Sequence, residues 1–213
     1  MRLAGLYAIT PDAVDSHILI ERVRAAMKGG APNGWAAVQY RNKLAGAEQR
    51  AAEARALASL CAGYGVPLIV NDDVELALAV GAEGAHLGSN DGDMVAARAR
   101  LGTRLLGTSC YDRLDVARRA VAAGTDYVAF GSVFPSPTKP GAVRAPLALF
   151  AHARALGVPL VAIGGITLEN AAEVVRAGAD CVAVISGLFD APDPAARARA
   201  FTAVFSNRMS PTA

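Results

Sequence analysis

Short apolar segments recur along the chain, and longer, more polar stretches separate them. The segments are rich in β-branched and other apolar residues in continuous runs, which is typical of parallel strands buried on both faces of a sheet. Eight such segments are expected to form strands, at residues 6–10, 36–41, 67–72, 84–87, 105–110, 126–133, 159–163 and 181–185.

The stretches between these segments carry apolar residues three or four positions apart and are rich in Ala, Arg, Glu and Leu. This spacing predicts helices, most clearly at residues 48–61, 94–101, 114–123 and 171–177. Many of the stretches end in a glycine, which can take the left-handed backbone conformation that often terminates a helix. Such glycines include Gly63, Gly81, Gly102, Gly124, Gly157 and Gly178.

Eight strands alternating with helices in 213 residues predict an α/β fold, a (β/α)8 barrel of the TIM type. An open, doubly wound sheet is the alternative. In both folds, polar groups at the carboxyl ends of the strands form the functional site. We expect one barrel domain over residues 1–206 and a flexible C-terminal tail over 207–213.

The amino-acid composition and the net charge indicate which classes of binding partner to expect. Hydrophobic residues make up 53% of the chain, and abundant Ala and Gly suit helices packed closely around a buried sheet. The formal net charge is only +2 and the basic residues are dispersed, so we expect neither nucleic acid nor a membrane surface as a partner. Cys61, Cys110 and Cys181 form no CxxC pair and are expected to be structural thiols.

The N-terminal residues lead directly into a predicted strand. They lack the charged region, apolar stretch and cleavage site of a secretory signal. No apolar run reaches the roughly 18 to 20 residues needed to span a bilayer. A cytoplasmic location is therefore expected.

Gln39, Arg41 and Lys43 occupy alternate positions where the second predicted strand ends. In an extended chain their side chains share one face, and that face is positive. Two cations directed into a barrel would be costly unless they met anions at its open end, and a substrate phosphate would serve. The alternative is that these residues form the solvated tip of a loop.

Carboxylates follow the third and fourth predicted strands. The third strand ends in Asn71, Asp72 and Asp73, and Asp73 is well placed to cap the next helix, which leaves Asp72 for another role. Asp91 follows the fourth strand, and Asp93 is expected to cap the helix after it. Because adjacent strands make Asp72 and Asp91 neighbours, they offer what Mg²⁺ usually receives beside substrate phosphates.

The later strand ends offer further anion-binding groups. Ser136, Thr138 and Lys139 lie among prolines that stiffen their loop, which suits the capture of an anion, although a Pro-rich loop without a role is the alternative. The last two strands end in glycine-bearing turns at 164–165 and 186–187. Many (β/α)8 barrels bind a phosphate there through backbone N–H groups, although Gly-Gly turns also occur without ligands.

Several motifs occur at these strand ends in a fixed order: QYRNK (39–43), NDD (71–73), HLG (86–88) with Asp91, GTS (107–109), FGSVFPSPTK (130–139), AIGGI (162–166) and VIS (184–186). Together they resemble the thiamine-phosphate synthase family. The resemblance spans residues 6 to about 190. The SPTK loop, combined with QxRxK and the spaced aspartates, makes it more specific than a likeness between barrels.

The resemblance implies an enzyme that joins two phosphorylated small molecules. Hydroxymethylpyrimidine diphosphate and hydroxyethylthiazole phosphate would give thiamine phosphate and pyrophosphate, with Mg²⁺ as cofactor. The implied reaction is a dissociative substitution in which the diphosphate leaves before the thiazole nitrogen attacks. The protein would then act through charge stabilisation and positioning, without a general acid or base.

The resemblance also implies roles for single residues. Those implied as catalytic are Arg41, Lys43, Ser109 and Lys139. Those implied to bind the pyrimidine diphosphate are Gln39, Arg41, Lys43, Asn71, Ser109 and Lys139, and Tyr40 and Asn42 are also expected to bind substrate. Ser136, Pro137 and Thr138 are implied to line the thiazole side, and Gly165, Ile185 and Ser186 are implied to hold the thiazole phosphate. The implied Mg²⁺ ligands are Asp72 and Asp91.

The chain departs from the family pattern at Ser89–Asn90, where an acidic residue after Gln is more usual, and at Tyr111, where many members have histidine. One alternative is the related thiazole tautomerase, which uses a histidine at the position of Tyr111. Another is a non-catalytic phosphate-binding barrel. His86 is expected to be structural, because no nucleophile or carboxylate pairs with it at a recognisable spacing. The sequence leaves open Mg²⁺ against Mn²⁺ and the oligomeric state, with a homo-oligomer among the alternatives.

Overall fold

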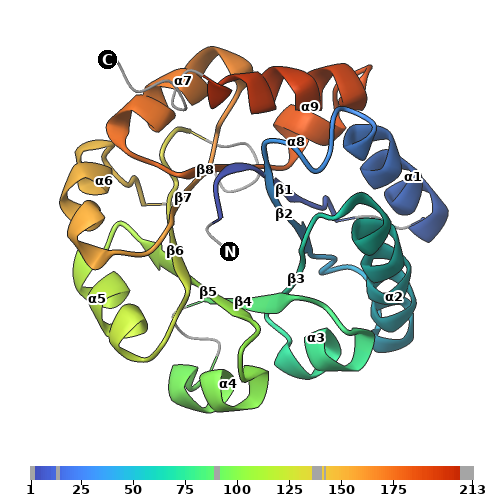
Figure 1. Ribbon diagram of the computed structural model, residues 1–213, viewed down its shortest axis with the longest axis horizontal. Coiled ribbons are helices and arrows are strands. Elements are labelled where there is room, and N and C mark those ends of the chain that lie inside the picture. Colours follow the sequence, from blue (N-terminus) through green and yellow to red (C-terminus); the bar gives the residue numbers. More distant parts are fainter. Residues whose placement is uncertain (1–2, 13–14, 89–91, 136–140, 142, 207–213) are drawn as a thin grey trace.

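The structure is a computed structural model that describes residues 3–12, 15–88, 92–135, 141 and 143–206. Parallel strands follow one another in chain order around a closed barrel, and the last strand pairs with the first (Figure 1). The predicted (β/α)8 fold is therefore confirmed. The strands are β1 (Gly5–Ile9), β2 (Trp35–Tyr40), β3 (Leu68–Asn71), β4 (Gly84–Gly88), β5 (Leu105–Tyr111), β6 (Tyr127–Phe130), β7 (Leu160–Ile163) and β8 (Cys181–Val184).

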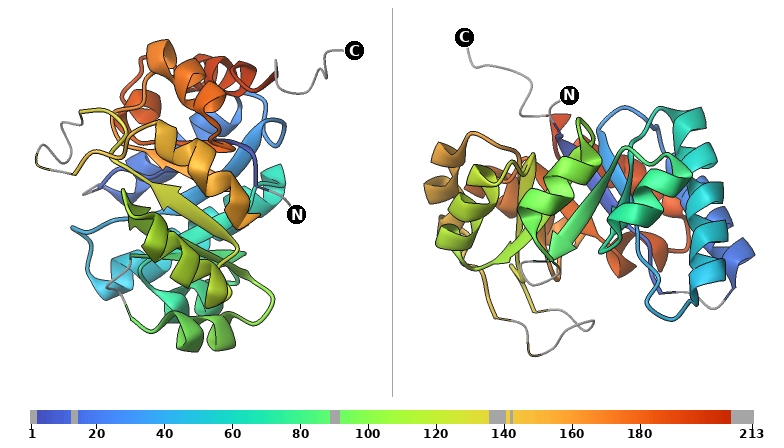
Figure 2. Two further views of the ribbon diagram at one scale, coloured as in Figure 1. Left: turned by 90° about the vertical axis from the view of Figure 1, so that its left-hand side faces the viewer. Right: turned by 90° about the horizontal axis from the view of Figure 1, so that it is seen from below.

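Helices form a ring outside the barrel, as the views in Figures 1 and 2 show. The last of them, α9, packs against α1 and so closes the ring. The helices are α1 (Ser16–Met27), α2 (Ala47–Tyr64), α3 (Val74–Val80), α4 (Met94–Leu101), α5 (Leu114–Ala122), α6 (Ala148–Ala153), the 3₁₀ helix η1 (Arg154–Leu156), α7 (Leu168–Ala177), α8 (Ser186–Phe189) and α9 (Pro194–Ala203).

Side-chain caps set where several helices begin. Asp73 and Asp93 cap α3 and α4 through their carboxylates, as predicted. Helix α7 begins at Leu168, before the predicted start, because Thr167 and Asn170 form a capping box. The residues that set the start of α7 are polar, so the spacing of apolar residues did not reveal them.

Two further boundaries differ from the sequence prediction by more than one residue. Helix α2 continues through Gly63 and ends at Gly65, whose φ of +67° is the left-handed conformation expected of the terminating glycine. The strand predicted at 126–133 ends at Phe130. The N–H of Gly131 still donates to the Tyr111 carbonyl at the end of β5, whereas the N–H of Val133 donates to the Ile163 carbonyl at the end of β7.

Apolar side chains form two layers, because successive side chains along a strand point to opposite faces of the sheet. Val128 and Phe130 of β6 belong to the outer layer, between the barrel and the helices. Tyr127 and Ala129 belong to the inner layer, which fills the barrel. The inner layer includes tyrosine hydroxyls, so the floor beneath the barrel mouth is partly polar.

The surroundings of the three cysteines suit the expected structural role. Cys61, Cys110 and Cys181 are all buried, and among the residues that the structure describes no disulfide joins them. Burial is the main cause that raises the pKa of the Cys61 and Cys110 thiols to about 12, which keeps them protonated and unreactive. In the described part of the chain, no helix is both long enough and apolar enough to cross a membrane.

Two glycines predict opposite effects of the same substitution. A Cβ on Gly107 of β5 would lie 2.0 Å from the Tyr127 ring, whereas one on Gly63 of α2 would meet nothing within 4 Å. We expect Gly107→Ala to lower the free energy of unfolding by about 1–3 kcal/mol through overpacking. Gly63→Ala should raise it by about 0.5–1 kcal/mol, because alanine favours a helix. Urea denaturation measures both, and changes of the same sign would contradict this assignment.

Candidate active site

A cavity of about 850 Å³ opens at the carboxyl ends of the strands, and every strand end contributes to its wall. This is the place where (β/α)8 barrels carry their functional residues. The predicted site residues that the structure brings together in this wall are Gln39, Arg41, Lys43, Asn71, Asp72, Ser109, Gly165, Ile185 and Ser186.

The remaining predicted site residues do not line this cavity in the described structure. Five of them lie outside the described residues, and their roles stay predictions: Asp91, Ser136, Pro137, Thr138 and Lys139. Pro135 and Val143, which flank residues 136–142 in the sequence, both line the cavity.

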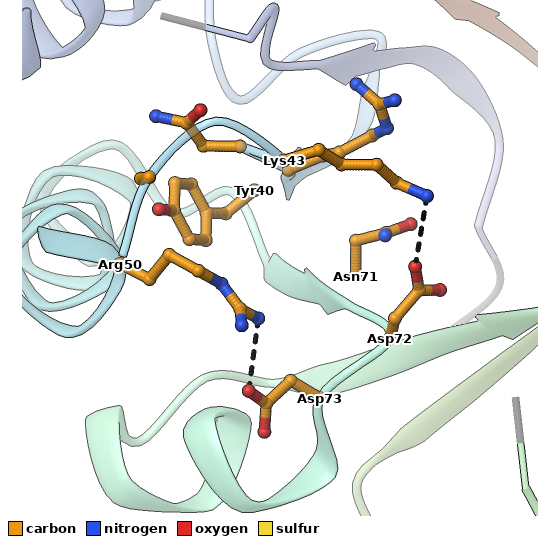
Figure 3. A pocket seen from close by; sticks show the side chains of 9 residues that line it. Tyr40, Lys43, Arg50, Asn71, Asp72 and Asp73 are labelled. Carbon is orange, nitrogen blue, oxygen red and sulfur yellow. Dashed lines mark hydrogen bonds and ion pairs between the residues drawn. The ribbon is translucent and has the colours of Figure 1, made fainter. Parts of the chain in front are cut away.

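Tyr40 and Asn42 point away from the cavity. The odd-numbered residues of segment 39–43 face the cavity, whereas Tyr40 and Asn42 line a neighbouring hollow of about 310 Å³ (Figure 3). Both donate hydrogen bonds to Glu53 of α2. The two cations of the segment border both spaces. The sequence motif thus contains two sets of residues with different surroundings.

The cations of this segment are held from the β1 side by residues that follow that strand. The Arg41 guanidinium donates to the Asp12 carboxylate at 2.8 Å, and the backbone N–H of Lys43 donates to the same carboxylate at 2.7 Å. The Thr10 hydroxyl bonds both the N–H and the C=O of Arg41 at 2.8 Å. Sequence reasoning missed Asp12, although a carboxylate just past the first strand must lie beside the second strand of a barrel.

Glu53 holds the same segment from the helix side. Its side chain is buried, with the residue 1% exposed, and its carboxylate accepts four hydrogen bonds from uncharged side chains. The donors are Ser16, Tyr40, Asn42 and Gln49. Burial raises the pKa of Glu53, but these hydrogen bonds outweigh burial and bring the pKa below its ordinary value of 4.5.

Asp72 and Asp73 have different surroundings, and the cap predicted at Asp73 is confirmed. Asp73 caps α3 and pairs with Arg50 at 3.0 Å, whereas the Asp72 carboxylate lies 3.8 Å from the Lys43 ammonium (Figure 3). Asp72 has a φ of +59°, and Tyr111 at the end of β5 has a φ of +54°. Left-handed backbone in residues other than glycine is uncommon and clusters at functional sites. Both residues line the cavity.

Asp72 fits a metal that is bound together with its substrate. Among the residues that the structure describes, no group of three or more His, Cys, Asp or Glu could hold a metal ion. Mg²⁺ usually takes one or two protein carboxylates and fills its other positions with water and substrate phosphate oxygens. Among the described residues that line the cavity, the carboxylates are those of Asp72, beside Asn71, and Asp112. Asp72 therefore suits a metal that takes most of its ligands from substrate and water better than it suits a closed structural site.

A chain of hydrogen bonds crosses the floor of the cavity. The Gln39 amide donates to the Tyr7 hydroxyl at 3.2 Å, and the Tyr7 and Tyr127 hydroxyls lie 2.7 Å apart. Tyr127 lies 3.2 Å from His86 Nδ1, and His86 Nε2 lies 2.8 Å from the Ser109 hydroxyl. Burial raises the pKa of Tyr7 and of Tyr127 above the ordinary value of 10, so both phenols stay neutral. His86, predicted to be structural, therefore contacts a predicted site residue.

Glycines are among the residues that line the wall near β7 and β8. Gly165 has a φ of +61°, and a Cβ there would lie 2.2 Å from the carbonyl oxygen of Pro135. The Asn170 amide donates to the Gly165 carbonyl at 3.0 Å and fixes this turn. Ile185 and Ser186 follow at the end of β8. Glycine at position 165 permits the close approach of two loops.

The barrel and its cavity define a (β/α)8 enzyme with a charged wall near β2 and β3 and a wall near β7 and β8 that contains glycines and Ser186. A family model described as thiamine monophosphate synthase matches residues 6–188. The chain belongs to this family. It is accordingly a transferase of thiamine biosynthesis, as the resemblance implied.

Individual relatives agree with the family match. A thiamine-phosphate synthase of Chromobacterium violaceum is 55% identical over 208 residues, which cover 97% of this chain and 99% of that protein. The solved structure of a thiamine phosphate pyrophosphorylase from Pyrococcus furiosus superimposes with a TM-score of 0.84 at 32% identity, over 97% of this chain and 98% of that one. A 3-hexulose-6-phosphate synthase, 17% identical with a TM-score of 0.69 over 93% of this chain and 98% of its own, shares the fold.

The lowered pKa of Glu53 predicts how its contribution to stability depends on pH. A carboxylate whose pKa is depressed by folding stabilises the protein above its unfolded pKa, and the stabilisation is lost as the pH falls through the folded pKa. At pH 7 we expect Glu53→Gln to lower the free energy of unfolding by about 1–3 kcal/mol, because donors lose their acceptor. The difference from wild type should shrink as the pH falls below 4.5. Urea denaturation at several pH values measures it, and a constant difference would contradict the charged state.

Proposed function

We propose that the chain joins hydroxymethylpyrimidine diphosphate to hydroxyethylthiazole phosphate, with Mg²⁺, and releases thiamine phosphate and pyrophosphate. One observation carries the proposal: a single cavity combines Arg41, Lys43 and Asp72 on one wall with Gly165 and Ser186 on another. The first set suits a metal-bound diphosphate, and the second suits a monophosphate held by backbone and hydroxyl groups. The cavity thus has room and charge for two anionic substrates.

The chemistry follows from where the charges lie. The bond between the pyrimidine methylene carbon and the diphosphate oxygen breaks, and the diphosphate leaves with the electron pair. Arg41 and Lys43, with Lys139 from the loop, stabilise the negative charge that develops on the leaving group. The thiazole nitrogen then donates its lone pair to the pyrimidine-stabilised cation. No proton moves in these steps, so no side chain has to act as an acid or base.

The residues that line the cavity also have proposed roles in binding the metal and the pyrimidine substrate. Asp72 and Asp91 would hold Mg²⁺, which supplies further charge neutralisation to the diphosphate. Asn71 and Ser109 lie where they could bind polar groups of the pyrimidine substrate, and Gln39 presents its amide from the floor. Ser109 is held by His86 at 2.8 Å, so its hydroxyl is oriented before substrate arrives.

The proposal is tested by pyrophosphate release from the purified protein. We expect release only when both substrates and Mg²⁺ are present, with an equal amount of thiamine phosphate formed. Reactions without the thiazole phosphate, or with excess EDTA, serve as controls. A folded protein that releases no pyrophosphate would contradict the proposal and would leave the thiazole tautomerase reaction as the next to assay.

Arg41→Ala and Lys139→Ala test the charge stabilisation directly. Each should slow pyrophosphate release by at least about tenfold, because each removes a cation beside the leaving group. Arg100→Ala is the matched control: it removes the same charge from an exposed arginine, paired with Glu75 outside the cavity, and should leave the rate unchanged. Circular dichroism checks that each variant is folded. Equal rates for the Arg41 and Arg100 variants would remove Arg41 from the site.

A further inference from the structure

We propose that Glu53 is a positioning residue, which directs Arg41 and Lys43 into the cavity by holding the residues between them from behind. Glu53 itself does not line the cavity. The inference rests on the proposed function, because it assumes that the two cations meet a diphosphate.

The first step is the alternation of side chains along the segment. Successive residues of an extended chain point to opposite sides. Gln39, Arg41 and Lys43 line the cavity, so the residues between them must face α2. There the Tyr40 hydroxyl and the Asn42 amide meet the same carboxylate oxygen, Oε2 of Glu53, at 2.7 and 3.0 Å. One atom therefore holds the outer side of the segment at two points.

The second step is that the sheet itself no longer holds the chain here. Strand β2 ends at Tyr40, and the bond from Thr10 N–H to the Gln39 carbonyl is among the last between β1 and β2. Beyond it, the direction of Arg41 depends on side chains that reach the segment. Thr10 and Asp12 reach it from the β1 side, and Glu53 reaches it from α2. Contacts from both sides restrain the segment from rotating and turning its cations away.

The third step separates the two oxygens of Glu53. Oε2 accepts from Tyr40 and Asn42, whereas Oε1 accepts from Ser16, the first residue of α1, at 2.7 Å, and from Gln49, one turn earlier in α2, at 2.8 Å. Loss of the Ser16 hydroxyl would therefore remove one hydrogen bond from the Glu53 carboxylate and leave in place the two bonds by which Oε2 holds the segment. Ser16→Ala is a control that costs one hydrogen bond to the same group.

The inference gives Tyr40 and Asn42 a different role from the one that the family motif implied. They bind no substrate in this scheme. They transmit the position of α2 to the cations beside them, and loss of either should weaken diphosphate binding without any contact with the diphosphate.

The test compares Tyr40→Phe and Asn42→Ser with Ser16→Ala and wild type. Binding of inorganic pyrophosphate in the presence of Mg²⁺ is measured by isothermal titration calorimetry, and thermal unfolding is measured beside it. We expect the first two variants to raise the dissociation constant roughly fivefold, and Ser16→Ala to change it by less than about twofold, although all three lower the unfolding temperature. In the enzyme assay, the Michaelis constant for the pyrimidine diphosphate should rise in the first two variants, and that for the thiazole phosphate should stay constant.

The outcomes separate this inference from the proposed function. If wild type binds no pyrophosphate, the proposed function fails, and the positioning role fails with it. If wild type binds and the Tyr40 and Asn42 variants bind equally well, the positioning role alone is overturned. An equal loss of binding in Ser16→Ala would also overturn it, because the effect would then reflect general loss of stability. A rise in the Michaelis constants of both substrates together would do the same.

Discussion

The pairing of β8 with β1 is the interaction on which the rest of the site depends. It closes a sheet of parallel strands, so that all the carboxyl ends meet in one ring. Residues from opposite ends of the chain, such as Ile9 and Ser186, are thereby placed around one cavity. Closure also leaves each strand only one inner face, and the period of two along the strand then decides which side chains reach the cavity.

The same geometry sorts polar groups by depth. Below the mouth, where the ladder is complete, the polar side chains include two neutral phenols, an amide and an imidazole, linked by hydrogen bonds. Among the described residues that line the cavity, the acidic and basic side chains of Arg41, Lys43, Asp72, Asp112 and Arg113 all lie just beyond the strand ends. A charge deeper in the barrel would lose its hydration without gaining interactions that compensate for the loss. A charge at the rim stays hydrated until a substrate replaces the water. The floor is therefore suited to orientation and the rim to binding of anions.

Periodic and terminal signals in the sequence were sufficient for the barrel, for the caps at Asp73 and Asp93, and for the gathering of most predicted residues in one cavity. They were insufficient for contacts between residues far apart in the chain. Tyr7 meets Tyr127 across the barrel, and neither belongs to a motif. The QYRNK motif was interpreted as one binding unit, so the different surroundings of Arg41 and Asn42 were not predicted. The alternation of side chains along a strand would have assigned these two residues to opposite sides.

Glu53 can position Arg41 and Lys43 without neutralising their charges, because the groups that donate hydrogen bonds to its carboxylate are uncharged. An ion pair from Glu53 to Arg41 would fix the segment equally well, but it would turn the guanidinium toward α2 and place its charge against a carboxylate. Uncharged donors satisfy Glu53 instead, and they reach it from the outer side of the segment. Asp12 does pair with Arg41, but that pair is partly exposed to water, where ion pairs are weak, and guanidinium donors remain for an anion. The positive charge therefore stays directed toward the cavity.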